Sequence, residues 1–153
     1  MNLDLENTFS LAGNLAMVGW ALLAFGPRRW GVLTLTGAVI PSLLAILYGA
    51  LMFIHFADSG GGYGSLAEVR ALFGKDELLL AGWVHYLAFD LAVGAYIAAE
   101  ADRAGLSRLI QFPFLVMTLM FGPVGFLLFQ LTRVGWLGAD RLAANRAVAR
   151  GAS

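Results

Sequence analysis

The sequence predicts an all-α integral membrane protein, one domain over residues 1–153 that crosses the bilayer with four helices. Three observations predict this class. Of the 153 residues 59% are apolar, 13% are charged, and the charges are nearly absent from four long apolar stretches. Soluble domains average about 25% charged residues, so the composition argues against a soluble enzyme, a nucleic-acid-binding protein or a disordered linker. The chain has no cysteine, which excludes disulfides and thiolate metal sites.

The four apolar stretches are the predicted membrane spans. They cover about residues 8–26, 31–57, 78–99 and 109–132. Each reaches the roughly 20 residues that a helix needs to cross the hydrocarbon core. Asp90 is the one formal charge among them. The first stretch follows Asp4 and Glu6 rather than a basic segment, so it does not resemble a cleavable signal peptide.

The segments between the spans contain turn and capping signals. Gly26 and Pro27 break the chain between spans one and two. A glycine-rich loop, residues 58–64, follows span two, and Ser65 with Glu68 then has the spacing of a helix-capping box. We therefore expect a short amphipathic helix here, on the membrane or on the mouth of the bundle. The C-terminal tail, residues 133–153, is predicted to be an interfacial helix that frays.

Orientation follows from the predicted number of spans and from the basic residues. Four spans place both chain termini on the same side of the membrane. The two short loops hold Arg28, Arg29, Arg103 and Arg108. The positive-inside rule then makes these loops cytoplasmic and the termini external, although the arginines of the C-terminal tail favour the opposite orientation.

Polar residues inside the spans are the candidate functional groups. A carboxylate at the centre of a membrane helix costs at least about 2.5–3.5 kcal/mol, so Asp90 is expected to face the bundle and to be paired or protonated. Tyr86 precedes it by one turn on the same face. His85 is five residues from Asp90, about 140° around the helix, so the two can border a cavity only between several helices. In span two, Tyr48 and His55 share a face.

The predicted substrate-binding residues are aromatic side chains and one histidine near the middle spans. They are Trp83, Tyr86, Phe89, Tyr48, Phe53 and His55. An apolar cavity lined by such rings would suit a hydrophobic ligand. The alternative for Tyr48 and Trp83 is helix packing or interfacial anchoring, and for His85 with Asp90 it is a structural hydrogen-bond network. Axial haem ligation by His55 and His85 is a further alternative; no metal-spacing motif is present, so we expect neither metal nor cofactor.

Three sequence runs in order resemble the abscisic-acid-deficient-4-like family of membrane proteins. The core run is Ala81–Leu91, AGWVHYLAFDL, and its flanks are Gly64–Gly74 and Leu119–Gly125. The resemblance extends from about Tyr48 to Phe129. It implies a role in neoxanthin formation from violaxanthin, which is an intramolecular epoxide opening on a membrane-dissolved carotenoid. The missing organelle-targeting extension leads us to expect a bacterial-type member in the inner membrane.

The resemblance also implies roles for individual residues. Trp83, His85 and Asp90 match the family's core motif, and Pro123 and Gly125 match it in span four. We expect Asp90 to be the acid at the epoxide oxygen and His85 the base that removes a proton from carbon. The expected partners are membrane lipid, a carotenoid or related isoprenoid and, as an open alternative, a second copy of the chain. The competing interpretation is a non-catalytic carotenoid-binding or assembly protein.

Overall fold

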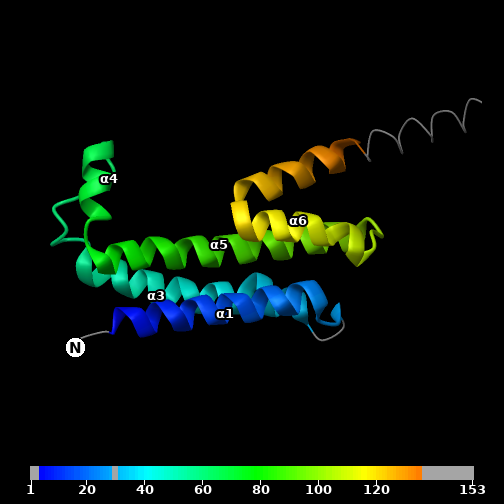
Figure 1. Ribbon diagram of the computed structural model, residues 1–153, viewed down its shortest axis with the longest axis horizontal. Coiled ribbons are helices and arrows are strands. Elements are labelled where there is room, and N and C mark those ends of the chain that lie inside the picture. Colours follow the sequence, from blue (N-terminus) through cyan, green and yellow to red (C-terminus); the bar gives the residue numbers. More distant parts are fainter. Residues whose placement is uncertain (1–3, 29–30, 136–153) are drawn as a thin grey trace, which may run out of the picture.

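Three long helices form the body of the protein. The computed structural model describes residues 4–28 and 31–135, and in this part of the chain it contains helices and no strand. Helix α1 is Leu5–Phe25, and α5 is Asp76–Arg103. Between them α2 (Val32–Thr34), η2 (Leu35–Val39) and α3 (Ile40–His55) join into one rod. The three rods lie side by side (Figure 1), and each is long and apolar enough to cross a membrane. The all-helical class is therefore confirmed.

Local sequence explains where α1 begins and ends. The Asp4 side chain accepts a hydrogen bond from the backbone N–H of Asn7, which caps the helix. At the other end the N–H of Gly26 still bonds Leu22, and Pro27 then stops the helix. The buried side of α1 presents small residues and two large ones to the bundle. These are Ala12, Ala16, Gly19, Trp20 and Leu23.

Helix α5 is the centre of the bundle. It contacts α1, α3 and α6, and its 28 residues span about 42 Å at 1.5 Å per residue. Alanine and glycine on its buried faces let the neighbours approach closely. A Cβ on Gly94 would lie 2.5 Å from the Trp20 ring, so this glycine makes the space that the indole fills.

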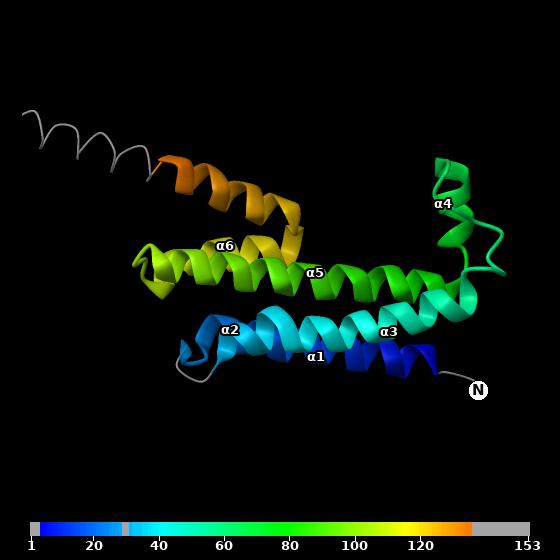
Figure 2. The same cartoon turned by 180° about the vertical axis from the view of Figure 1, so that it is seen from behind.

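The predicted amphipathic helix is present as α4 (Leu66–Leu72). Its cap is the expected one, since the Ser65 hydroxyl accepts a hydrogen bond from the Glu68 N–H at 3.2 Å. Figure 2 shows α4 projecting to one side of the bundle, roughly perpendicular to the long helices, at the end where α3 ends and α5 begins. Leu72 is buried while Leu66 is exposed.

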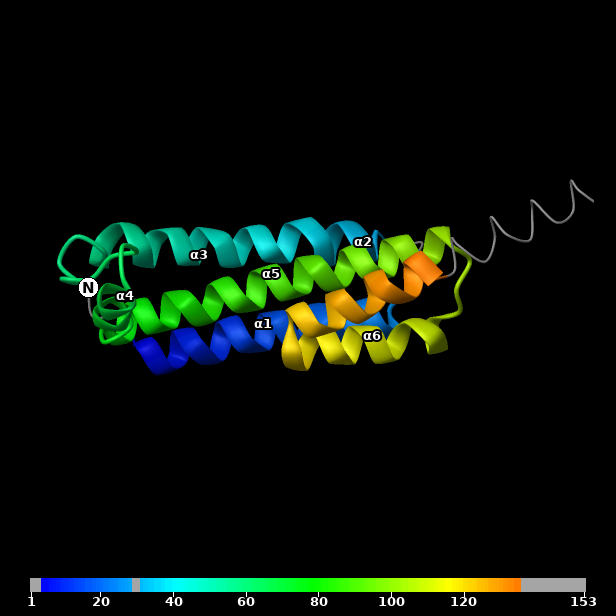
Figure 3. The same cartoon turned by 90° about the horizontal axis from the view of Figure 1, so that it is seen from above.

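The fourth predicted span, 109–132, is not confirmed. Helix α6 (Arg108–Phe121) has 14 residues, about 21 Å, and ends at Gly122. Residues 123–135 are again helical but run back beside α6 (Figure 3). The physical reason is local: Gly122 has φ +47°, which favours glycine, and Pro123 starts the second helix without needing an N–H donor.

The predicted interfacial tail lies mostly outside the described residues. Of residues 133–153 the structure describes 133–135, which continue the last helix.

Candidate functional site

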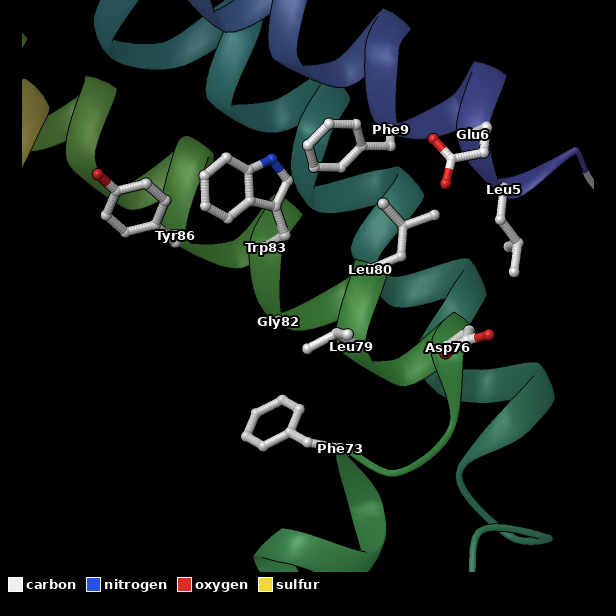
Figure 4. Close-up of a pocket in the computed structure, with 10 residues that line it drawn as sticks. All are labelled: Leu5, Glu6, Phe9, Phe73, Asp76, Leu79, Leu80, Gly82, Trp83 and Tyr86. Carbon is white, nitrogen blue, oxygen red and sulfur yellow. The ribbon is translucent and has the colours of Figure 1, made fainter.

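A large pocket lies between the beginnings of α1 and α5. It has a volume of about 740 Å³, within the usual range for small-molecule sites. Its walls are mostly apolar, and two carboxylates stand at one end of it (Figure 4). The lining residues are Leu5, Glu6, Phe9, Phe73, Asp76, Leu79, Leu80, Gly82, Trp83 and Tyr86.

A row of aromatic rings forms one wall of this pocket. The Phe9 ring of α1 stacks on Trp83 of α5 with centroids 5.6 Å apart, and Trp83 contacts Tyr86 at 5.3 Å. Phe73, which follows α4, lies over Gly82. A Cβ added to Gly82 would lie 2.6 Å from the Phe73 ring. The end of α4 thus contributes a side chain to the pocket.

Beyond the pocket, Tyr86 leads to Asp90. The Tyr86 hydroxyl donates to the backbone carbonyl of Leu119 in α6 at 2.9 Å. Asp90, one turn further along α5, is partly buried and faces the turn after α6: a Cβ on Gly122 would lie 2.9 Å from its Oδ1. Asp90 Oδ2 is buried and has no hydrogen-bond partner. An unpartnered carboxyl oxygen in an apolar bundle is costly, and such a position is a default functional hypothesis.

His85 lies on a different side of α5 from Asp90. Its ring stacks on Phe89 with centroids 4.6 Å apart and contacts Tyr48 of α3 at 5.3 Å. Asp90 instead faces Gly122. The two residues proposed as acid and base therefore contact different helices, and His85 does not line the pocket.

The predicted binding residues separate into two groups. Trp83 and Tyr86 line the main pocket, whereas Phe89 and Tyr48 pack around His85. Phe53 is 93% exposed and borders a shallow hollow of about 430 Å³ beside Phe56 and Tyr63. His55, at the end of α3, lines neither space.

The structure adds pocket residues that the sequence analysis did not select. Glu6, Phe9, Phe73 and Asp76 line the pocket, and Gly122 lies against Asp90. Glu6 and Asp76 each sit in the first turn of a helix, and both line the same pocket because α1 and α5 begin at the same end of the bundle.

A second polar cluster holds the opposite end of the bundle together. Arg28 pairs with Asp102 at 2.8 Å, and the Gln111 amide donates to the other Asp102 oxygen at 2.6 Å. Gln111 is 1% exposed. Arg108 also donates to the Gly26 carbonyl at 2.6 Å. Every group here has a partner, which is the pattern of a structural clamp.

No group of three or more His, Cys, Asp or Glu side chains in the described parts of the chain is arranged to hold a metal ion.

A protein-family model matches most of the chain. The family model ABA4-like, described as ABA DEFICIENT 4-like, matches residues 7–129. This range covers α1 from Asn7 onward and all of Val32–His55, α5, α6 and Gly122. No curated protein and no solved structure matches the chain.

Proposed function

The chain belongs to the ABA DEFICIENT 4-like family, and from this we propose that it binds a carotenoid or related isoprenoid within the membrane and isomerises it. The family suggests a neoxanthin-synthesis-associated protein. The observation that carries the proposal is the apolar pocket of about 740 Å³ whose aromatic wall ends at Tyr86, one turn before the partly buried Asp90. Tyr86 lines the pocket and Asp90 follows it by four residues on α5, about 6 Å along the helix axis, a separation that a carotenoid is long enough to span.

The pocket wall suits a conjugated apolar chain. Phe9 and Trp83 present ring faces, and Leu79, Leu80 and Phe73 add aliphatic and aromatic surface. Trp83 is 41% exposed, so a ligand can cover it without displacing packed side chains. Burial of apolar surface contributes about 25 cal/mol per Å².

The proposed chemistry is an epoxide opening without net gain or loss of atoms. Asp90, as a neutral carboxylic acid, gives its proton to the epoxide oxygen while the carbon–oxygen bond breaks. A base then removes a proton from a carbon of the same molecule, which forms a double bond and leaves an alcohol. Two groups of this chain are candidate bases: His85, and the Asp90 carboxylate itself, since its Oδ2 has no partner.

A second candidate function is non-catalytic binding of the same ligand. The observation that favours it is the placement of His85, which packs against Tyr48 and Phe89 rather than in the pocket. In that case Asp90 fixes the position of Gly122 and transfers no proton.

Purified protein in liposomes containing violaxanthin tests the proposal. We expect the wild type and an Asp58→Asn control to form an isomer with an allenic spectrum, and Asp90→Asn to bind the carotenoid without converting it. Asparagine keeps the size of the side chain but cannot act as a carboxylic acid. Conversion by Asp90→Asn at the wild-type rate would refute the acid role.

The base is identified by His85→Gln in the same assay. A large fall in turnover with unchanged carotenoid binding assigns the base to His85, and unchanged turnover assigns it to Asp90. A Soret band and stoichiometric iron in the wild type, lost in His85→Gln, would instead support the haem alternative.

A further inference from the structure

Helix α6 and residues 123–135 form a helical hairpin against the second half of α5. At the open end of the hairpin, Gln111 bonds Asp102 and Arg133 pairs with Glu100 at 2.6 Å. At its tip, Gly122 lies against Asp90. Asp90 is 14 residues from the beginning of α5 and 13 from its end. The hairpin therefore reaches the middle of a membrane-spanning helix and turns back.

The two legs of the hairpin are antiparallel and in contact. The rings of Phe114 and Phe129 lie 5.7 Å apart, whereas residues 15 apart in one straight helix would be separated by about 22 Å. Gly125 makes the contact close, because a Cβ at this position would lie 2.3 Å from the Thr118 backbone nitrogen.

The tip is suited to a position inside the membrane. The Gly122 N–H donates to the Thr118 carbonyl at 2.8 Å, and the Gly122 carbonyl accepts from the Gly125 N–H at 3.1 Å. Pro123 has no N–H to satisfy. Unsatisfied backbone groups in hydrocarbon cost several kcal/mol each, and turns at membrane depth occur only where protein buries them. Gly122 is buried.

We infer that residues 108–135 form a re-entrant hairpin. The hairpin enters the membrane from the side where α5 ends, reaches the midplane of the bilayer and returns to the same side. A hydrophobic helix of 10–14 residues is too short to cross and is typical of such segments. The chain then crosses three times, with α1, Val32–His55 and α5. The beginning of α1 and the open end of the hairpin lie on opposite sides of the membrane. This inference does not depend on the proposed function.

The hairpin also determines where the pocket opens. Helix α6 contacts both α1 and α5, and its Phe112 ring lies 6.1 Å from Phe25 near the end of α1. The pocket lies against the beginnings of the same two helices. A complete fourth span would continue along α1 and α5 and cover the pocket between their beginnings. A half-length hairpin instead leaves that pocket open to the lipid of one leaflet.

Single cysteines test the topology, because the natural chain has none. Asp58→Cys, Ser107→Cys and Val134→Cys are exposed positions in the loop before α4, at the start of α6 and near the end of the hairpin. In sealed vesicles of one orientation, a membrane-impermeant maleimide should label Ser107→Cys and Val134→Cys from the same side and Asp58→Cys from the other. The buried Ala98→Cys should label only after denaturation.

Four crossings predict the opposite pattern for one variant, with Val134→Cys on the same side as Asp58→Cys, and that result would overturn the inference. A second measurement is independent of accessibility. The double variant Phe114→Cys with Phe129→Cys should be joined by a short bifunctional thiol reagent within one chain. A membrane-inserted double variant whose two cysteines react singly but are never joined would also overturn the hairpin.

Discussion

Replacing Gly122 by alanine should destabilise the protein in two separable ways. The first is backbone strain, because φ +47° with ψ −103° is a conformation that residues with a Cβ rarely adopt. The second is steric, because the new Cβ would lie 2.9 Å and 3.1 Å from the two Asp90 oxygens. Backbone strain of this kind costs about 1–3 kcal/mol, and overpacking adds about 1–3 kcal/mol.

Gly60 provides a matched control. It also has positive φ, +66°, but no atom lies within 4 Å of its Cβ position. Gly60→Ala should therefore carry only the strain, about 1–2 kcal/mol for a left-handed residue. Gly122→Ala should exceed it by about 1–3 kcal/mol. This excess combines the contact with Asp90 and any additional strain from ψ −103° at Gly122, and a double-mutant cycle separates the two.

The assay is reversible unfolding in mixed detergent micelles, followed by far-UV circular dichroism, on a double-mutant cycle. Asp90→Ala removes the carboxyl group that the new methyl group would contact. Gly122→Ala should therefore lower the free energy of unfolding less in the Asp90→Ala background, by about the 1–3 kcal/mol assigned to the steric contact. Equal costs in both backgrounds, or equal stabilities of Gly122→Ala and Gly60→Ala, would refute the contact between the hairpin tip and Asp90.

Three further predictions concern the pocket and the packing. Trp83→Ala should weaken carotenoid binding several-fold in a fluorescence titration, because an aromatic contact contributes about 0.5–1.5 kcal/mol; Phe53→Ala, 93% exposed, should leave the affinity unchanged, and equal losses would argue against the main pocket. Gly125→Ala should lower the free energy of unfolding by about 1–3 kcal/mol, whereas Gly49→Ala, with open space at its Cβ position, should be neutral or stabilising; similar values would contradict the close contact of the legs. Gln111→Leu should cost about 1–3 kcal/mol in the same unfolding assay, because it removes a donor to a partly buried carboxylate; a neutral result would show that the clamp contributes nothing to stability.

The helical framework could be predicted because its signals are local. Hydropathy identifies the three long helices, and a serine followed three residues later by a glutamate identifies α4. The hairpin could not be predicted in this way. Residues 109–132 have the length and hydropathy of a crossing, and averaged hydropathy does not distinguish one full crossing from two half crossings. The local signal that points to a turn is the pair Gly122 and Pro123.

The candidate site was predictable only along a single helix. Helical spacing places Tyr86 and Asp90 on one face of α5, and in the structure Tyr86 bonds Leu119 and Asp90 lies against Gly122, both on the side of α6. Which neighbour each face meets depends on packing, so the sequence did not show that His85 faces Tyr48 while Asp90 faces the hairpin. The place of Glu6 in the pocket could not be predicted, because Glu6 precedes the first apolar span and reaches the pocket only through the alignment of two helices that are distant in sequence.

The wide turn η2, Leu35–Val39, has a consequence for how this chain compares with its relatives. Here the Ile40 N–H donates to the Leu35 carbonyl five residues back, and a π turn holds one residue more than an α turn. The extra residue rotates Val32–Thr34 by about 100° relative to a regular helix continued backwards from α3. Deleting one residue from this turn would restore a plain α-helix and leave the face of α3 toward α5 unchanged. A relative without the bulge is therefore expected to show a one-residue gap between positions 35 and 39 and to keep the register of everything that follows.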